Sequence, residues 1–299
     1  MYNAENKARW LELKNSETIS SPNYYENKMD NAEPFETMFN KDLCNFTVAE
    51  IIDMYKGMNF YSATTVYITN KIYAEYTDWC VKEGLVADSQ NHYMEITRQM
   101  TIDCLNASAM KSRVVSREQV IEWCNKAWNA ADKYLLLGLF EGIKGNRYVD
   151  FTDTKISDID GNKIYLASGR TLEFSDTLIN YALNCYEEDK YIYYGSEFVS
   201  VLASGDEIMR EVARSRSDSD RNKWHRIFIR SKMFFDYIGI RGVISMNAIR
   251  ISGAIDYINK RAEKEGISAK EYIEKYKEEI EYRYMKMYKF YDTYKDFLI

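Results

Sequence analysis

One stretch of this chain is patterned for β-strands, and it lies between long segments patterned for helices. Residues 148–176, YVDFTDTKISDIDGNKIYLASGRTLEFSD, contain period-two runs separated by DIDGNK and ASGR, which are both typical turn sequences. The pattern predicts a three-stranded meander. The whole chain has only two prolines and 13 glycines, which favours helices elsewhere over a turn-rich sandwich. The sequence therefore predicts a mainly α protein with a small antiparallel β-meander, in the α+β class.

Capping signals indicate where several helices begin. Three capping boxes, each a Ser or Thr followed three residues later by Glu or Gln, are Thr47–Glu50, Ser116–Gln119 and Ser268–Glu271. Ser62 is predicted to cap a longer helix that stops near Gly84. After Ser116, an apolar pattern predicts one helix through residues 120–140.

The length of 299 residues suits two domains, each large enough for its own core. Residues 1–40 hold both prolines and many Asn and Ser, which predicts an N-terminal arm or a loosely packed cap. Residues 41–107 are expected to form a small helical domain, 108–117 a linker and 118–299 the second domain. The last helix is expected to start at Ser268, and its apolar stripe is longer than one small domain is expected to cover.

Composition excludes several classes of protein. The net charge is −6, so any nucleic-acid partner requires locally concentrated positive charge. The five cysteines lie far apart and there are only two histidines, so no metal and no cofactor are expected. An odd cysteine count and a polar N-terminus without a signal peptide predict reduced thiols in a cytoplasm. No run approaches the ~18 apolar residues of a membrane span, so no membrane partner is expected.

The most suggestive local feature is EGIKGNRYVDF, residues 141–151, which follows the apolar run YLLLGLF. The chain turns through two glycines and then presents Lys144 and Arg147, three residues apart. Two cations at the end of a buried helix suit an anion, and the commonest macromolecular anion is a phosphodiester.

Positive charge is also concentrated near the end of the chain. Between Ser204 and Arg250 there are ten Lys and Arg against six Asp and Glu, a local charge of +4. The densest part contains four cations that are candidates for DNA contact, although a solvated, flexible loop explains this part equally well: Arg221, Lys223, Arg226 and Arg230. Asn247 and Arg250 follow on a helix that Ser245 is expected to cap, and their spacing places them on one face, off the apolar stripe.

The order of these features resembles the tyrosine recombinases, the phage integrase superfamily, over about residues 42–290. The family's first box, Thr-Gly-Leu-Arg-x-x-Glu, is matched by residues 141–147, with Lys144 at the arginine and Arg147 at the acidic residue. Its second box, His-x-x-Arg, is matched by Asn247 and Arg250. The family's hairpin lysine falls near residues 168–170, where the chain has Ser-Gly-Arg. Four tyrosines are candidates to align with the family nucleophile, but none has a recognisable context: Tyr272, Tyr276, Tyr282 and Tyr284.

The resemblance implies a two-domain clamp around duplex DNA, and its departures imply lost chemistry. The family attacks a phosphodiester with a tyrosine hydroxyl while cations neutralise the transition state, and losing one such donor typically costs ~10²–10³ in rate. Positive charge survives here, including at Arg170, so the surface can still hold a phosphate backbone. This pattern resembles the MrpR phage repressors, whose core-binding domain is similar to residues 46–84. That similarity adds four residues to the expected DNA contacts, although Ser62 is also a plain N-cap: Ser62, Thr64, Thr65 and Lys71.

We therefore expect a sequence-specific double-stranded DNA-binding protein, a phage or prophage repressor with no catalytic residues. The chain could also self-associate through its C-terminal helix or bind a regulatory protein. One alternative is a divergent, active recombinase. A second is an interaction protein that kept the fold and binds a partner through its tyrosine-striped C-terminal helix.

Overall fold

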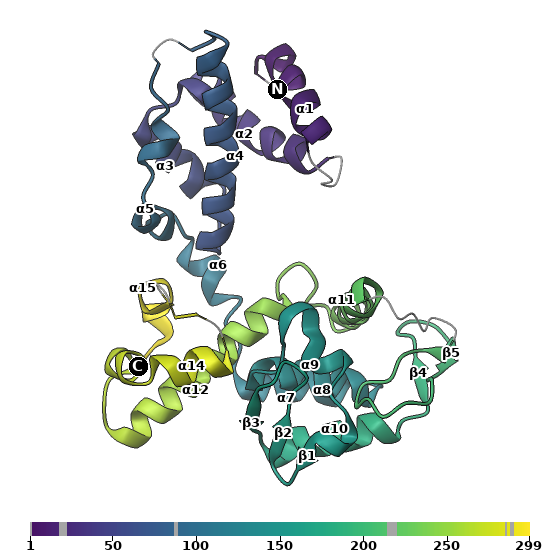
Figure 1. Ribbon diagram of the computed structural model, residues 1–299. Helices are drawn as coiled ribbons and strands as arrows, with labels where there is room; N and C mark the ends of the chain where they lie inside the picture. The colour runs from purple at the N-terminus through teal and green to yellow at the C-terminus, as the bar shows by residue number, and fades with distance from the viewer. Residues whose placement is uncertain (1, 18–22, 87–88, 214–219, 285, 288–289) are drawn as a thin grey trace. The chain divides into compact units, whose positions relative to one another are not determined.

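The computed structural model describes the chain apart from residues 1, 18–22, 87–88, 214–219, 285 and 288–289. The chain divides into two compact units, Met1–Lys111 and Ser112–Ile299. The division falls inside the segment 108–117, where the sequence loses its periodicity. Figure 1 shows helices in both units and the small strands in the second.

The first unit is helical and is organised around its longest helix, α4 (Ala63–Lys82). The apolar side of α4, which includes Val66, Tyr73 and Tyr76, is fully buried. The capping box at Thr47 is present and opens α3. The remaining elements are α1 (Ala4–Glu17), α2 (Tyr24–Phe39), η1 (Leu43–Asn45), α3 (Val48–Gly57), η2 (His92–Glu95), α5 (Arg98–Asp103) and α6 (Ala107–Lys111).

The first 40 residues are more firmly packed than their composition predicts. Trp10 and Met29 are fully buried in the same core as Tyr76. Lys7 is also fully buried, where its ammonium donates to Glu36 and Asp42. A buried lysine is tolerated only when it is paired in this way. The segment that was expected to be a loose arm therefore contributes side chains to the core of the first unit.

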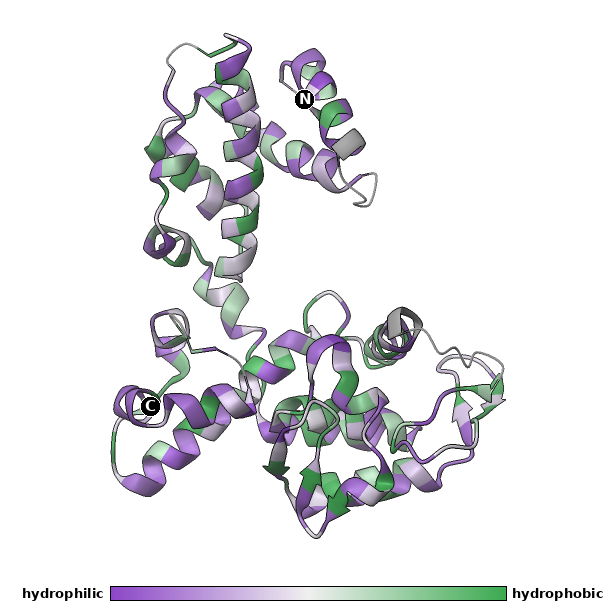
Figure 2. Ribbon diagram, in the orientation of Figure 1, coloured by the Kyte–Doolittle hydropathy of each residue, from purple (hydrophilic) through white to green (hydrophobic). Residues whose placement is uncertain are grey.

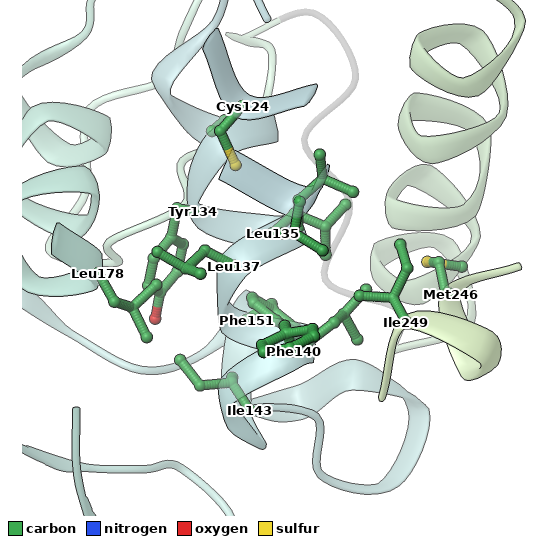
Figure 3. Close-up of a cluster of buried hydrophobic side chains, with 14 of the residues drawn as sticks. Cys124, Tyr134, Leu135, Leu137, Phe140, Ile143, Phe151, Leu178, Met246 and Ile249 are labelled. Carbon is green, nitrogen blue, oxygen red and sulfur yellow. The ribbon is translucent and has the colours of Figure 1, made fainter. Parts of the chain in front are cut away.

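The second unit is built around α8 (Ala130–Glu141), in which every residue from Tyr134 to Glu141 is buried. An α-helix that is apolar on all sides belongs inside a core. Its neighbours are α7 (Arg117–Lys126), α10 (Asp176–Glu187) and α12 (Met246–Glu265). Figure 3 shows Leu178 of α10 and Ile249 of α12 converging on this central helix.

The single helix predicted over residues 120–140 is interrupted between α7 and α8. At the break, the side chain of Asn129 makes two hydrogen bonds to the backbone of Ile192. It donates to the carbonyl at 3.0 Å and accepts from the amide at 2.8 Å. These bonds fasten the start of α8 to a neighbouring strand. Side chain–backbone bonds of this kind compete with helix propagation, which the apolar pattern alone does not reveal.

The predicted meander is confirmed, and its strands are short. Strands β1 (Ile159–Asp160), β2 (Lys163–Tyr165) and β3 (Thr171–Glu173) form an antiparallel sheet in the order β1-β2-β3. Ile164 lies opposite Leu172, and both are buried. The preceding residues form α9 (Val149–Thr152), preceded and followed by η3 (Asn146–Tyr148) and η4 (Ile156–Asp158), so the YVDF segment is not a strand.

The residues after Thr177 also contain a hairpin that the sequence reading missed. Strands β4 (Lys190–Ile192) and β5 (Val199–Val201) pair antiparallel between α10 and α11 (Asp220–Tyr237). Each strand has only three residues, too few for alternation to stand out from a helical pattern.

The long C-terminal helix expected after Ser268 is broken into shorter pieces. The capping box is present and opens α13 (Ala269–Lys275), which is followed by α14 (Lys277–Arg283), α15 (Phe290–Tyr294) and η6 (Lys295–Phe297). The breaks fold the tyrosine-rich stripe back onto α12. Tyr272, Ile280 and Tyr284 are thereby buried against Ile255 and Ile258 of the same unit.

Within the described part of the chain, no helix combines the length and apolar character needed to cross a bilayer. Polar and apolar residues are mixed along the helices of both units, as Figure 2 shows. The described residues hold no group of three His, Cys, Asp or Glu placed to bind a metal. All five cysteines are buried free thiols.

Candidate nucleic-acid interface

The turn after α8 is conformationally unusual. Gly142 caps the helix with φ +105°, Gly145 follows with φ +62°, and Arg147 and Tyr148 adopt φ values of +50° and +61°. The last two are not glycines, and residues held in this region cost of order 1–3 kcal/mol each and cluster at functional sites. A side chain at Gly142 would come within 2.9 Å of the carbonyl of Arg283, so the turn also needs glycine for close packing.

A close helix crossing brings the second predicted box to this turn. At Gly253 of α12, an added Cβ would lie only 1.7 Å from the carbonyl oxygen of Phe140 in α8. The backbones of α8 and α12 are therefore in direct contact here, because Gly253 has no side chain to separate them. Arg250 precedes Gly253 by about one turn. As predicted, it shares a face with Asn247, to whose Oδ1 it donates at 3.1 Å.

Lys144 and Arg250 form a cluster of like charge around Tyr148. Both cations are partly buried, and the Lys144 ammonium lies 5.6 Å from the centre of the Tyr148 ring. Burial lowers the pKa of Lys144, and the charge of Arg250 lowers it further. Burial likewise lowers the pKa of Arg250, the charge of nearby Arg170 lowers it further, and Tyr148 opposes the shift.

Neither cation of this cluster is neutralised within the described part of the chain. No carboxylate contributes to the environment of Lys144 or Arg250, and the buried Nε of Arg250 has no hydrogen-bond partner. Buried donors are nearly always satisfied in folded proteins, so an orphaned one needs an explanation. An anion bound between Lys144 and Arg250 would satisfy the donor and offset the repulsion.

Arg170 lies close by but is engaged in holding the fold together. Its guanidinium forms an ion pair with the fully buried Asp150 and donates to the carbonyl of Arg283 at 2.8 Å. It also donates to the carbonyls of Tyr282 and Gly142. Sequence reasoning missed Asp150, because the family's acidic residue was aligned three positions earlier at Arg147. The isolated Asp in the apolar context of YVDF was the available signal.

Arg147 points to a separate depression. It is exposed and lines a cavity of about 250 Å³ together with Asn146, Thr152 and Lys223. Lys223 is already paired with Asp153, which lines the same cavity, at 2.7 Å. Arg147 forms no ion pair within the residues that the structure describes. Arg147 therefore lines this cavity, whereas Lys144 and Arg250 are not among its lining residues.

The other cations of the basic segment have partners in their own unit. Arg226 forms a 2.6 Å ion pair with Glu211. Arg230 is only 9% exposed, and its guanidinium stacks 4.6 Å from the centre of the Tyr191 ring. The side chain of Arg221 lies outside the described residues. Arg226 and Arg230 are thus engaged by contacts within the second unit.

The candidate residues of the first unit lie at the start of α4. Ser62 occupies the N-cap position, but its side chain makes no capping hydrogen bond. Thr64 and Lys71 are exposed, and Thr65 is half-buried. The N-terminus of a long helix attracts anions through its unpaired amides and its dipole.

The four candidate tyrosines have different environments. Tyr272 and Tyr284 are buried, and the Tyr284 hydroxyl donates to the carbonyl of Phe140 at 3.1 Å. The Tyr276 hydroxyl donates to Glu265 at 2.9 Å. Tyr282 is 48% exposed, accepts a hydrogen bond from the amide of Thr171, and offers its carbonyl to Arg170. Of the four, Tyr282 is the one whose own atoms accept a hydrogen bond from Arg170 in the described structure.

A helical unit is followed by a second unit with a three-stranded meander and a cationic turn, in the order that the sequence resemblance predicts. The chain belongs to the MrpR family. Residues 1–82 match the MrpR N-terminal core-binding domain, and residues 114–298 match the MrpR C-terminal catalytic domain.

The chain is also similar to several individual proteins. The SPbeta prophage-derived uncharacterized protein YopR of Bacillus subtilis (strain 168) is 26% identical over 200 residues, which cover 64% of this chain and 60% of that protein's length. Among solved structures, a lambda integrase (75–356) dimer bound to a COC' core site has 17% identity and a TM-score of 0.38, covering 87% of this chain and 88% of that one. XerA recombinase has 12% identity and a TM-score of 0.38, covering 86% and 84%.

Proposed function

We propose that this protein is a sequence-specific double-stranded DNA-binding repressor of phage or prophage origin, built on a recombinase fold that does not cleave DNA. One observation carries the proposal: Lys144 and Arg250 are partly buried, adjacent and unneutralised in the described structure. The fold brings two like charges together at an energetic cost, and a phosphate group offsets that cost. Arg147 and, separately, the start of α4 in the first unit are the further proposed DNA contacts.

The same geometry argues against strand cleavage. Lys144 stands at the position of the family's first arginine. Its ammonium is a point charge, which cannot bind two phosphate oxygens at once as a guanidinium does. Asn247 stands at the box-two histidine and binds Arg250. At the hairpin, Arg170 is committed to Asp150 and to three backbone carbonyls. Binding survives these changes more readily than catalysis, because binding needs charge whereas catalysis needs each group in position.

Membership of the MrpR family and the prophage origin of its YopR relative support a role in prophage regulation, in the cytoplasm of a bacterial host. We do not include self-association through the C-terminal helix. The stripe that suggested it is buried against α12 of the same unit. We retain a regulatory protein partner in the proposal and assign no surface of the chain to it.

The binding part of the proposal is tested by selecting ligands from a random duplex library. A repressor should enrich one sequence motif. Its affinity for that motif should fall steeply with salt, with a log–log slope near roughly −5 to −7 if about 5–8 phosphates are neutralised. Failure to bind any duplex at low salt would refute the proposal and favour the interaction-protein alternative.

An active recombinase is the second candidate, because Tyr282 lies partly exposed beside Arg170. Suicide substrates carrying the selected motif test it directly. We expect no covalent protein–DNA adduct. An adduct that disappears in Tyr282→Phe would establish the enzyme instead, whereas Tyr276→Phe serves as the matched control on a tyrosine bonded to Glu265.

A further inference from the structure

A second cavity lies in the first unit, and none of the residues assigned above to DNA lines it. Its volume is about 240 Å³. It is bounded by α2, by the segment that follows α3, and by α4. The lining residues are Lys28, Asn31, Phe35, Met58, Phe60, Thr69 and Tyr73.

The walls of this cavity are fixed by specific contacts. The ring of Phe35 packs so closely on Gly57 that a Cβ there would lie 2.6 Å from it. The carbonyl of Phe60 accepts from the amide of Asn106 at 2.8 Å. The hydroxyl of Tyr73 donates to the carbonyl of Lys28 at 2.7 Å, which ties α4 to α2. The cavity is therefore preformed and needs little rearrangement to accept a ligand.

One cation lies against these apolar walls. The ammonium of Lys28 donates to the Thr69 hydroxyl at 3.0 Å and, within the described residues, has no carboxylate partner. An ammonium has three donors, so two remain for a ligand. Burial lowers the pKa of Lys28, which shows that water does not fully solvate this charge. The amide of Asn31 adds a further polar group on the same wall.

We propose that this cavity binds a carboxylate attached to a compact apolar group. The carboxylate accepts from Lys28, and the apolar group packs against Phe35, Met58 and Phe60. Two sources offer this chemistry, a small free carboxylic acid and the C-terminal residue of a peptide. The aromatic and thioether walls with one polar end are the usual composition of a small-ligand site.

The proposed site lies on the back of the helix assigned to DNA. At about 100° per residue, Thr69 and Tyr73 face roughly opposite to Thr64 and Lys71 on α4. The exposure of Thr64 and Lys71 and the burial of Thr69 and Tyr73 agree with this arrangement. The inference is independent of the proposed function, because it depends only on the packing of α2 on α4.

Methyl NMR on the full chain with 13C-methyl methionine tests the site. Met58 lines the cavity, and Met38 is 69% exposed outside it and serves as the internal control. We expect 3-phenylpropanoate to shift the Met58 methyl signal in a saturable way and leave the Met38 signal in place. The isosteric 3-phenylpropanamide should bind roughly tenfold more weakly or worse, because it loses the charge-assisted bond.

A second pair of probes distinguishes the two sources of the ligand. A short acetylated peptide ending in a free Phe carboxylate is compared with the same peptide ending in an amide. Tighter binding of the peptide acid than of 3-phenylpropanoate identifies a peptide C-terminus. The reverse order identifies a small carboxylic acid.

Lys28→Met keeps the length of the side chain and removes its charge. We expect at least a tenfold loss of affinity for the carboxylate, whereas Lys71→Met, on the exposed face of α4, should leave the affinity unchanged. Equal affinity for acid and amide in the parent protein would overturn the proposal even if Lys28→Met failed to fold. So would a Met58 signal that no probe moves, or a folded Lys28→Met that binds like the parent.

Discussion

Two groups of cations in the second unit have the same chemistry and different surroundings. Lys144 and Arg250 lie at the turn after α8 and on α12, partly buried and without carboxylate partners in the described structure. Arg226 and Arg230 lie on α11, where Glu211 pairs the first and Tyr191 covers the second. The first group is positioned to receive an anion from outside. In the second group, Glu211 pairs the charge of Arg226 and the Tyr191 ring covers Arg230.

The difference shows why a count of charges is a poor guide to an interface. The segment from Ser204 to Arg250 has a local charge of +4, yet its densest part supplies Arg226 and Arg230 to internal contacts. The turn at Lys144 has fewer cations but leaves them available. Electrostatic attraction for a phosphate depends on charge that the protein has not neutralised itself.

The largest expected effect is a loss of stability on replacing Arg170, a cation near the candidate site whose guanidinium makes contacts that hold the fold together. Arg170→Ala would leave Asp150 buried and unpaired, which typically costs about 3–5 kcal/mol. Urea unfolding of the variant should show this loss. Adding Asp150→Asn removes the buried charge and should recover part of it. A loss below about 1 kcal/mol would show that Arg170 is available for DNA after all.

The next effect is on binding, at a cation without a partner. Arg250→Ala should weaken affinity for the selected duplex by ~10- to 100-fold, since a charge-assisted contact contributes roughly 1.5–3 kcal/mol. The salt slope should become shallower by about 1, because one fewer phosphate is neutralised.

Stability is the control for Arg250→Ala. Removing the Arg250 side chain relieves its repulsion with Lys144 and Arg170 and eliminates a buried donor without a partner. The free energy of unfolding should therefore change by no more than about 0.5 kcal/mol. A variant that binds DNA like the parent would show that this pocket is not the phosphate site.

How far the sequence predicts the fold depends on whether local signals decide the structure. Capping boxes and the meander are local, and Thr47–Glu50 and the strands around Ile164 and Leu172 are found where expected. The stripe after Ser268 was predicted as one helix because its spacing is helical throughout. Its breaks are set by packing on α12, which no local pattern contains.

The candidate site was predicted in part for the same reason. The shared face of Asn247 and Arg250 follows from helical spacing, and their hydrogen bond agrees with it. Which cations have partners is a tertiary property. Asp150 is 20 residues from Arg170, and Glu211 is 15 residues from Arg226. A sequence of charges cannot distinguish a paired arginine from an unpaired one.

A smaller effect is expected from pH at Lys144. Its pKa in the free protein lies below the ordinary 10.5, and a bound phosphate should raise it again. Binding is then linked to proton uptake, so affinity falls as pH rises past the pKa of the free protein and levels off past that of the complex. Lys144→Arg stays charged throughout.

The comparison of parent and Lys144→Arg isolates this titration. The two should bind similarly at neutral pH and diverge by about three- to tenfold once the pH passes the pKa of Lys144 in the free protein, with the variant tighter. Parallel pH profiles would show that Lys144 does not contact phosphate. Lys144→Arg should also form no covalent adduct, because the other departures from the recombinase pattern remain.

The smallest expected effect gives the sharpest test of the contrast between the two groups. Arg226→Ala removes a full positive charge from the basic segment, as Arg250→Ala does from α12. If Glu211 neutralises Arg226 in the DNA complex as in the free protein, no phosphate contact is lost. Affinity should then stay within about twofold of the parent, and the salt slope should not change. Both variants should be measured against the same duplex over the same salt range. A tenfold loss for Arg226→Ala would mean that the ion pair opens to receive DNA, and internal pairing would then no longer separate structural cations from those that bind DNA.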